Sequence, residues 1–284
     1  MTSIDLPARA SADDRYWTPP LLWRCLLVAA RIFLPLFCRL RVTGDVPAEL
    51  RRGPLVLAAN HIGLFDPLAL VAACGVRRIA PRVMATAGVF RVPVGGALLR
   101  RCGHIRVDRS GGTGGGALDA ATAAVRARSV VAGYPEGRIS LDPGLWPERG
   151  RTGLARLALA TGTTVVPVVQ WGAHEVLAWD GVGTIVRTAV TALWRRPVVR
   201  VHFAAPVDLR GLSAGTPGHA QRATDRISAA MVAALTPLRI DEPGLPRHVD
   251  PTRPVSRART YRQRAPRSVH VQRDAGLRHR RERE

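Results

Sequence analysis

Short apolar runs alternate with helical patterns between Pro54 and Phe203, and this alternation constrains the fold more than any other feature of the sequence. The apolar runs have the length and composition of buried strands. They are "PLVLAA" (54–59), "RIAPRVMA" (78–85), "HIRVD" (104–108), "VVAGYP" (130–135), "TVVPVVQW" (164–171) and "PVVRVHFAAPV" (197–207). Parallel strands need long crossover connections, which are usually helices. The sequence therefore predicts an α/β fold with an open, mostly parallel sheet flanked by helices.

Helical patterns fill the connections between these runs. In "DPLALVAACG" (66–75), Asp66 is predicted at the N-cap, Pro67 at the first helical position and Gly75 just past the end. The other predicted helices are 94–103, 117–128, 151–162 and 219–238. Open α/β sheets bind ligands outside the carboxyl ends of their strands. Polar residues that directly follow a strand are therefore the candidates for a functional site.

The charge of the chain points to an anionic partner. The 284 residues are enough for one large or two small domains, and 46% of them are hydrophobic. The formal net charge is +21, and every basic side chain is an arginine. The absence of lysine excludes a Walker-type phosphate loop and a Schiff-base enzyme. The excess of arginine fits a membrane leaflet, a nucleic acid or a phosphorylated substrate, and composition alone does not choose among them.

The cysteines and the N-terminus give no sign of metal binding or export. Four isolated cysteines, without a C-x-x-C pair or a histidine at metal-ligand spacing, are typical of small buried hydrophobes in a reducing cytoplasm. They are Cys25, Cys38, Cys74 and Cys102. We expect no metal and no bound organic cofactor. The first twenty residues lack the charged-then-apolar order of a secretory signal.

The segment 21–40, "LLWRCLLVAARIFLPLFCRL", is strongly apolar but contains Arg24 and Arg31. A central arginine costs about 2.5–3.5 kcal/mol on insertion scales, which argues against a simple membrane span. An in-plane helix or helical hairpin that dips into the membrane is predicted, with the arginines reaching lipid phosphates. Its apolar contacts are assigned to Trp23, Leu26, Leu27, Phe33 and Phe37. The alternative is a helix packed on the protein's own core.

From residue 241 to 284 the chain is rich in arginine and proline and has no apolar period, which predicts a disordered basic tail. This tail either reinforces attraction to anionic lipid or nucleic acid, or has no specific role. The glycine-rich stretch 111–116 is interpreted as a flexible connection.

A histidine and an acid stand together at one strand end, in "NHIGLFDP". His61 and Asp66 are five residues apart, so on one helix they would lie about 140° apart around the axis. A turn from strand to helix brings them together, and Gly63 would let the backbone turn tightly. The carboxylate then fixes the imidazole tautomer and leaves the second nitrogen as a base. The alternative is that Asp66 only caps its helix and His61 is a surface histidine.

Two further strand ends carry arginines and a carboxylate. Arg109 follows "HIRVD", whereas Glu136, Gly137 and Arg138 follow "VVAGYP". Arginine pairs bidentately with phosphate, and Glu136 can accept a hydrogen bond from a hydroxyl or orient an arginine. A base, a carboxylate and two guanidinium groups would then surround one crevice.

These clusters resemble the four ordered motifs of the glycerophospholipid acyltransferase family, whose type member is 1-acylglycerol-3-phosphate acyltransferase. The matching segments are Asn60-His61 with Asp66, residues 103–109, 134–137 and "VVPV" at 165–168, within about residues 35–205. By this resemblance His61 is the base that activates the acceptor hydroxyl and Asp66 orients it.

The resemblance also assigns the binding residues. Arg109, Glu136, Gly137 and, less directly, Arg138 would bind the phosphate and glycerol of the acceptor, and Pro167 would lie near the acyl-donor site. The sequence departs from the family's motifs at two positions that would contact the acceptor. Gly63 stands where the family commonly has serine, and the third motif reads Glu-Gly-Arg-Ile instead of Glu-Gly-Thr-Arg, which moves the arginine forward by one residue.

The resulting hypothesis is an O-acyltransferase of phospholipid biosynthesis. It moves a fatty acyl group from acyl-CoA or acyl carrier protein to the free hydroxyl of a lysophosphatidic acid-like acceptor, on the cytoplasmic side of the cell membrane as a peripheral or monotopic protein. Its partners are an anionic membrane surface, a lysophospholipid and the acyl donor; nucleic acid is not expected. The predicted organisation is an N-terminal extension (1–20), a membrane-associating segment (21–40), an acyltransferase domain (41–240) and the tail (241–284).

Three alternatives remain at this point. The first is an acyltransferase for another acceptor, such as glycerol 3-phosphate or a glycolipid. The second is a non-catalytic, arginine-rich protein that binds membranes or nucleic acid. The third is a serine hydrolase, because "GLSAG" (211–215) fits the Gly-x-Ser-x-Gly elbow with Ser213 as nucleophile. The elbow must join a strand directly to a helix, whereas polar segments flank this motif on both sides.

Overall fold

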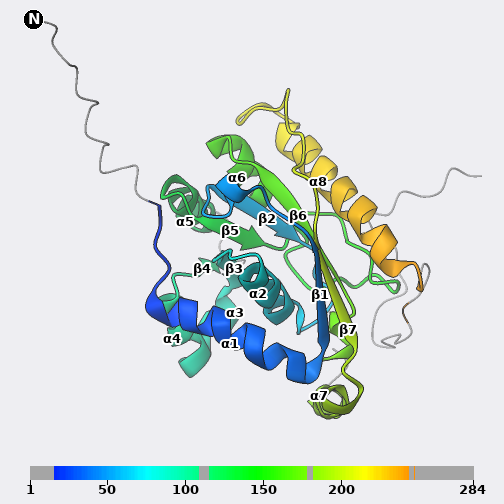
Figure 1. Cartoon of the computed structure of the whole chain (residues 1–284). Helices are drawn as coiled ribbons and strands as arrows, with labels where there is room; N and C mark the ends of the chain where they lie inside the picture. The colour runs from blue at the N-terminus through cyan, green and yellow to red at the C-terminus, as the bar shows by residue number, and fades with distance from the viewer. Residues whose placement is uncertain (1–15, 109–114, 178–181, 243–245, 247–284) are drawn as a thin grey trace, which may run out of the picture.

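A computed structural model describes residues 16–108, 115–177, 182–242 and 246 of the chain. Its centre is a seven-stranded sheet in the order β1-β7-β6-β2-β5-β3-β4 (Figure 1). The strands are β1 (Arg39–Gly44), β2 (Leu55–Ala59), β3 (Arg82–Thr86), β4 (Ile105–Val107), β5 (Val130–Gly133), β6 (Val165–Trp171) and β7 (Val198–Phe203). All neighbouring pairs are parallel except β6 and β7. The predicted mostly parallel α/β sheet is confirmed.

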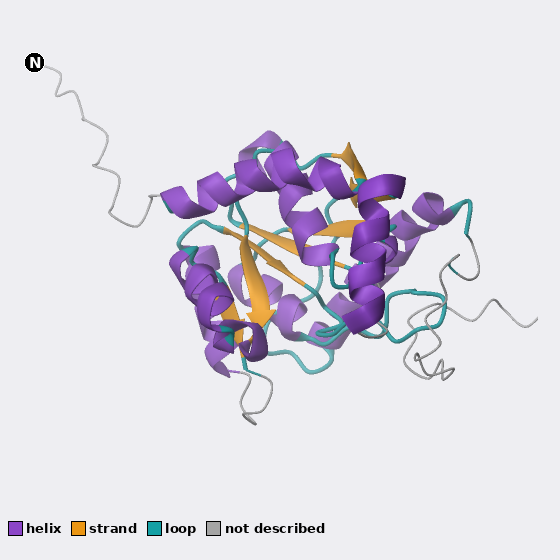
Figure 2. Ribbon diagram, turned by 90° about the horizontal axis from the view of Figure 1, so that it is seen from below, coloured by secondary structure: helices purple, strands orange, loops and turns teal. Residues whose placement is uncertain are grey.

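Helices cover both faces of this sheet, and the view from below shows the strands enclosed by them (Figure 2). The longer helices are α1 (Leu21–Phe37), α2 (Asp66–Val76), α4 (Pro93–Arg101), α5 (Gly115–Arg126), α6 (Gly153–Thr161), α7 (Val182–Arg195) and α8 (His219–Leu235). Shorter turns are α3 (Ala87–Arg91), η2 (Ala48–Leu50), η3 (Ala173–Glu175) and η4 (Thr236–Arg239).

Alternation along the strands builds two separate cores. In β2, Leu55 and Leu57 contribute to the core beneath α1 and α2, whereas Val56 and Ala58 contribute to the core beneath α5, α6 and α8. Successive side chains of a strand point to opposite faces, so a fully apolar strand serves both. The five residues of β2 are all buried, which explains why the run "LVLAA" shows no polar alternation.

Apart from 3-10 turns, the elements β1, α3 and α7 were not predicted from the sequence. β1 pairs only with β7 at the edge of the sheet, and its residues alternate between exposed and half-buried positions. Because β1 is largely polar, its sequence does not show the apolar pattern of a strand. The predicted start of the acyltransferase domain at residue 41 falls inside β1. The turn α3 is short, and α7 buries only Ala192 among its side chains. A polar edge strand and a helix of five residues leave a weak apolar period in the sequence.

The segment 21–40 forms the single helix α1, with Pro35 in its last turn, and then the start of β1. One side of α1 packs on the protein: Trp23, Leu27 and Leu34 are buried. The assignment of Trp23 and Leu27 to lipid is therefore wrong, because these side chains fill a core cluster with Cys102. Phe33 is 59% exposed. Among the described residues, no helix has the length and apolar character needed to cross a bilayer.

The cysteines follow the expectation in part. Cys38, Cys74 and Cys102 are buried, and burial raises the pKa of the Cys38 thiol to about 11. Cys25 is exposed on α1. Apart from residue 246, the predicted tail beyond Glu242 lies outside the described residues, as does most of the glycine-rich stretch 111–116.

Candidate active site

The carboxyl ends of β2, β5 and β6 lie side by side and form the base of the site. β2 is parallel to both neighbours, so the residues that follow the three strands meet at one edge. Asn60 and Gln170, both fully buried, join two of these ends. Asn60 Oδ1 accepts a hydrogen bond from the backbone N–H of Gln170 at 2.7 Å, and Asn60 Nδ2 donates to the Gln170 carbonyl at 3.0 Å. The segment that starts at His61 therefore leaves the sheet from a fixed point.

The turn between β2 and α2 brings His61 and Asp66 into contact. His61 Nδ1 lies 2.8 Å from Asp66 Oδ2; the Asp66 side chain is fully buried, and 16% of the His61 side chain is exposed. The same carboxylate oxygen accepts hydrogen bonds from the backbone N–H groups of Ile62 and Gly63. A carboxylate that accepts these bonds places the imidazole hydrogen on Nδ1. Nε2 is then the nitrogen that can take a proton.

The local roles of Asp66 and Gly63 differ from the prediction. α2 begins at Asp66 and its N-cap is Phe65, so Asp66 stands one position further into the helix and turns its carboxylate back onto the preceding loop. Gly63 does not have a left-handed backbone conformation. Space is tight at Gly63, because a Cβ would lie 3.3 Å from Cα of His174. The serine common at this position in the family would press on that backbone.

An aromatic ring supports the imidazole. The rings of His61 and Tyr134 stack with their centroids 4.2 Å apart and their planes at 21°. Tyr134 directly follows β5, the neighbour of β2. Burial raises the pKa of the Tyr134 hydroxyl well above its usual value, so this hydroxyl stays protonated. Tyr134 therefore limits the rotation of the imidazole while Asp66 fixes its tautomer.

Glu136 lies behind the histidine. Its Oε1 accepts a hydrogen bond from the backbone N–H of His61, and its Oε2 accepts one from the backbone N–H of Glu148, both at 2.9 Å. Its side chain is buried, and burial raises its pKa to about 8. Among the described contacts, Glu136 binds main chain and no arginine. Its carboxyl group links the two loops that form this side of the site.

The predicted arginine Arg138 is engaged by another residue. Its Nε and Nη2 donate to the two carboxylate oxygens of Glu148 at 2.9 and 3.0 Å, in a bidentate ion pair. Glu148 also accepts from the backbone N–H of Leu141. In this motif the arginine stands one residue earlier than is common in the family. At this earlier position it pairs with Glu148 within the same loop.

A different arginine lies at the site. Arg151 lines the same groove as His61, and its backbone N–H donates to the carbonyl of Pro135 at 2.8 Å. Its side chain crosses Gly137: a Cβ at Gly137 would lie 3.2 Å from Cδ and Nε of Arg151. Gly137 also has a positive φ of 69°, so glycine serves both the turn and the close approach. No sequence motif marks Arg151, because it lies beyond the third motif, two residues before α6.

His61 and Arg151 stand on the wall of one long apolar groove with a volume of about 890 Å³. The groove runs between α1, α2 and the strand ends. Its apolar walls include Phe33, Phe37, Leu68, Val71, Met84 and Leu154. His104 also lines it, with its pKa lowered to about 4 by burial and by Arg82, and is therefore neutral near pH 7. A hydrocarbon chain fits such a groove, with a polar end at His61 and Arg151.

Two predicted residues and one rival motif lie elsewhere. Pro167 is buried inside β6, beside Ala58, and does not line the groove. Arg109 lies outside the described residues. Ser213 is in a loop ten residues beyond the end of β7, and its backbone N–H donates to Nδ1 of His219. The strand-to-helix elbow of a serine hydrolase is not formed there.

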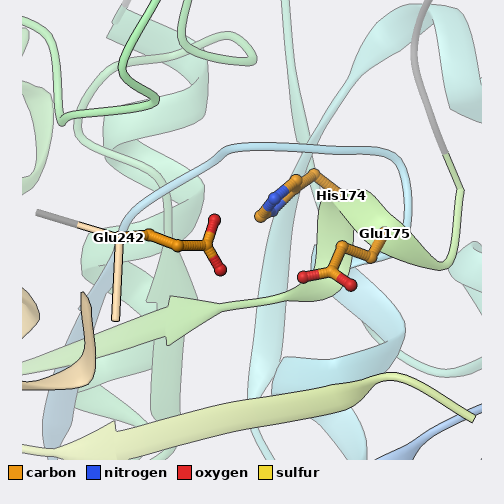
Figure 3. Close-up of side chains that lie close together, drawn as sticks. All are labelled: His174, Glu175 and Glu242. Atoms are coloured by element: carbon orange, nitrogen blue, oxygen red, sulfur yellow. The ribbon is translucent and has the colours of Figure 1, made fainter. Parts of the chain in front are cut away.

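A second polar cluster includes two residues of η3, the turn that follows β6. Figure 3 shows the side chains of His174, Glu175 and Glu242 converging, with their ligand-type atoms all within 4.8 Å of one another. These residue types bind divalent metals. Arginines line the same cavity, and their charge opposes a cation there; they are Arg39, Arg187, Arg195, Arg196 and Arg200.

Comparison with known proteins supports the fold and the type of domain. Residues 39–171 match the family model described as Acyltransferase. The structure is similar to that of the 1-acyl-sn-glycerophosphate (LPA) acyltransferase PlsC from Thermotoga maritima, with a TM-score of 0.56 and 19% sequence identity over 77% of this chain and 81% of that one. At this identity the likeness concerns the fold. No curated protein matches the sequence significantly. Residues 39–171 are therefore similar to the acyltransferase family, in agreement with the resemblance of the sequence motifs.

Proposed function

We propose that the protein transfers a fatty acyl group from a thioester donor, acyl-CoA or acyl carrier protein, to the free hydroxyl of a lysophosphatidic acid-like acceptor. The observation that carries this proposal is the 2.8 Å contact between His61 Nδ1 and Asp66 Oδ2 on the wall of an apolar groove. A tautomer-fixed imidazole beside space for a hydrocarbon chain supplies the base for acyl transfer to an alcohol.

In the proposed reaction, Nε2 of His61 takes the proton of the acceptor hydroxyl as its oxygen attacks the thioester carbonyl. A tetrahedral intermediate forms, the carbon–sulfur bond breaks, and the imidazolium returns the proton to the leaving thiolate. The products are the ester and a free thiol, and no acyl-enzyme is needed. Asp66 stabilises the imidazolium throughout, and Tyr134 holds the ring in plane.

Arg151 is proposed to bind the acceptor phosphate. Arg138 is paired with Glu148 and does not line the groove, whereas Arg151 does. Guanidinium groups bind phosphate bidentately, which would hold the acceptor hydroxyl near His61. Arg109 remains a second proposed phosphate ligand, and Glu136 and Gly137 act by shaping the loop. Pro167 remains a proposed residue near the acyl-donor site. The only support for this role is its position in β6.

The proposed setting is the cytoplasmic side of the cell membrane, with no metal or organic cofactor. The proposed organisation keeps a membrane-associating segment at 21–40, a catalytic domain at 41–240 and a basic tail at 241–284. The apolar groove favours an acceptor that carries a hydrocarbon chain over glycerol 3-phosphate.

The test is an assay of the purified protein with radiolabelled acyl-CoA and a panel of acceptors: lysophosphatidic acid, other lysophospholipids, glycerol 3-phosphate and a glycolipid. We expect labelled phosphatidic acid as the main product, and no product from the His61→Ala variant. Transfer that persists unchanged in this variant would remove His61 from the mechanism. Acylation of glycerol 3-phosphate alone would reassign the acceptor.

A further inference from the structure

Helix α7 presents an apolar face that no described part of the chain covers. Only Ala192 is buried in this helix, whereas Trp194 is 85% exposed and Val182 is 79% exposed. The exposed large apolar side chains are Val182, Val186, Val190, Leu193 and Trp194. At about 100° per residue they fall within about 120° of the helix circumference. A contiguous exposed apolar stripe of this kind marks an interaction surface.

A second apolar stripe lies on the adjacent helix. α1 and α7 are in contact, and both lie along the lower edge of the molecule in Figure 1. The exposed apolar side chains of α1 are Leu21, Val28, Ile32, Phe33 and Leu36. Arg24 and Arg31 are exposed too, and at about 100° per residue they stand along one border of this stripe. We call the two stripes together the docking face.

The charge beside the docking face selects its partner. Behind α7 lies a cavity of about 710 Å³, lined by five arginines and by the acidic residues Glu175, Asp241 and Glu242. The arginines are Arg39, Arg187, Arg195, Arg196 and Arg200. Valine, leucine and tryptophan bordered by arginine are typical of a helix that lies in the plane of an anionic bilayer. A second copy of the chain would bring like charges together, which disfavours a dimer through this face.

We infer that α7 is a second membrane-docking helix, which lies beside α1 in the headgroup region of an anionic bilayer. Trp194 sits at the interface, the apolar stripe enters the acyl region, and Arg187, at the border of the α7 stripe, meets lipid phosphates together with Arg24 and Arg31 of α1. The groove that contains His61 is lined by Phe33 of α1 and Ala189 of α7. Docking through both helices therefore turns this groove toward the lipid. This last step rests on the proposed function, whereas docking itself does not.

The test compares two matched double variants of the full chain. Val186→Glu with Val190→Glu places two carboxylates on the apolar stripe of α7. Ala229→Glu with Ala233→Glu places two carboxylates at the same spacing on exposed positions of α8, which covers the opposite face of the sheet. Binding is measured by flotation with vesicles of phosphatidylglycerol and phosphatidylcholine. We expect the α7 variant to lose at least about tenfold in binding, and the α8 variant to bind like the wild type.

Equal binding by the wild type and the α7 variant overturns the inference. So does a wild-type dimer that the α7 variant converts to monomer without a change in vesicle binding, because the face would then join two copies. Vesicle binding needs no catalysis, so an inactive protein that still binds through α7 refutes the proposed function and leaves the docking intact.

A second measurement reports insertion directly. Trp194 is the most exposed tryptophan among the described residues. Vesicles that contain brominated phospholipid should quench part of the tryptophan emission of the wild type, and the Trp194→Phe variant should lose most of that quenching. Equal quenching of both proteins contradicts insertion of α7.

Discussion

The backbone N–H of His61 donates a 2.9 Å hydrogen bond to Oε1 of Glu136, a buried residue 75 positions away in the chain. The other carboxyl oxygen holds the backbone of Glu148. The third motif of the family thus supports the first through main-chain contacts. The base is positioned from behind by Glu136, from the side by Tyr134 and through its ring nitrogen by Asp66.

Glu136 should make the stability of the protein depend on pH. Its pKa is raised by burial from 4.5 to about 8, so between these values the folded state holds a proton that the unfolded state has released. The free energy of unfolding therefore falls as the pH rises through this window. His104, with its pKa lowered to about 4, contributes the opposite slope only below about pH 6.5.

Thermal unfolding of the wild type and of Glu136→Gln, measured from pH 6.5 to 9, isolates this effect. The glutamine variant should be less stable at pH 6.5, because its amide group cannot accept the second backbone N–H, and its stability should fall less steeply as the pH rises. Parallel curves for the two proteins would contradict a raised pKa at Glu136.

Asp66→Asn should reduce kcat by about 10²–10⁴-fold, because an amide no longer fixes Nδ1–H or stabilises the imidazolium. The KM for the acyl donor should change little. Asp119→Asn, on the exposed side of α5, removes a carboxylate away from the site and is the control. Steady-state kinetics and unfolding midpoints are measured for both. A wild-type kcat in a folded Asp66→Asn protein would exclude the proposed orientation of the base.

Arg151→Ala should raise the KM for lysophosphatidic acid by about tenfold or more, the value of a charge-assisted bidentate contact, and leave acyl-donor KM unchanged. An acceptor without phosphate should be acylated equally well by variant and wild type. Arg156→Ala removes the same charge from an exposed position on α6 and should have no effect. If Arg151→Ala leaves the KM for the acceptor unchanged, the acceptor phosphate is bound by Arg109 or Arg138 instead.

Arg138→Ala should act on stability instead of substrate binding. It leaves the carboxylate of Glu148, whose side chain is 6% exposed, without its bidentate partner. The expected loss is about 1–3 kcal/mol in the free energy of unfolding. Chemical denaturation measures this loss, and kinetics on the folded fraction should give a wild-type acceptor KM. A large rise of that KM with normal stability would reverse the roles of the two arginines.

Ala29→Trp should narrow the apolar groove, which Ala29 lines from a half-buried position on α1. Transfer of long acyl chains, or to long-chain acceptors, should fall, whereas short chains should still react. A competition assay with acyl-CoA of several lengths gives the ratio of kcat/KM values. If all lengths lose equally, the groove does not hold a hydrocarbon chain.

Much of this molecule follows from local pattern. Buried strands are apolar throughout, and glycine or proline marks helix ends, so the α/β alternation and the turn between His61 and Asp66 are visible in the sequence. The order of the motifs indicates the family. Patterning fails at β1, because this edge strand is largely polar and exposed.

The sequence by itself determined which residues stand at the strand ends, because these residues directly follow the apolar runs that form the strands. Only the tertiary structure decided their partners. Arg138 meets Glu148, Arg151 crosses Gly137 into the groove, Glu136 reaches the backbone of His61, and Trp23 turns inward. These pairings depend on side-chain reach and on desolvation between segments that are distant in the chain. The spacing of residues along one strand or helix therefore does not predict these pairings.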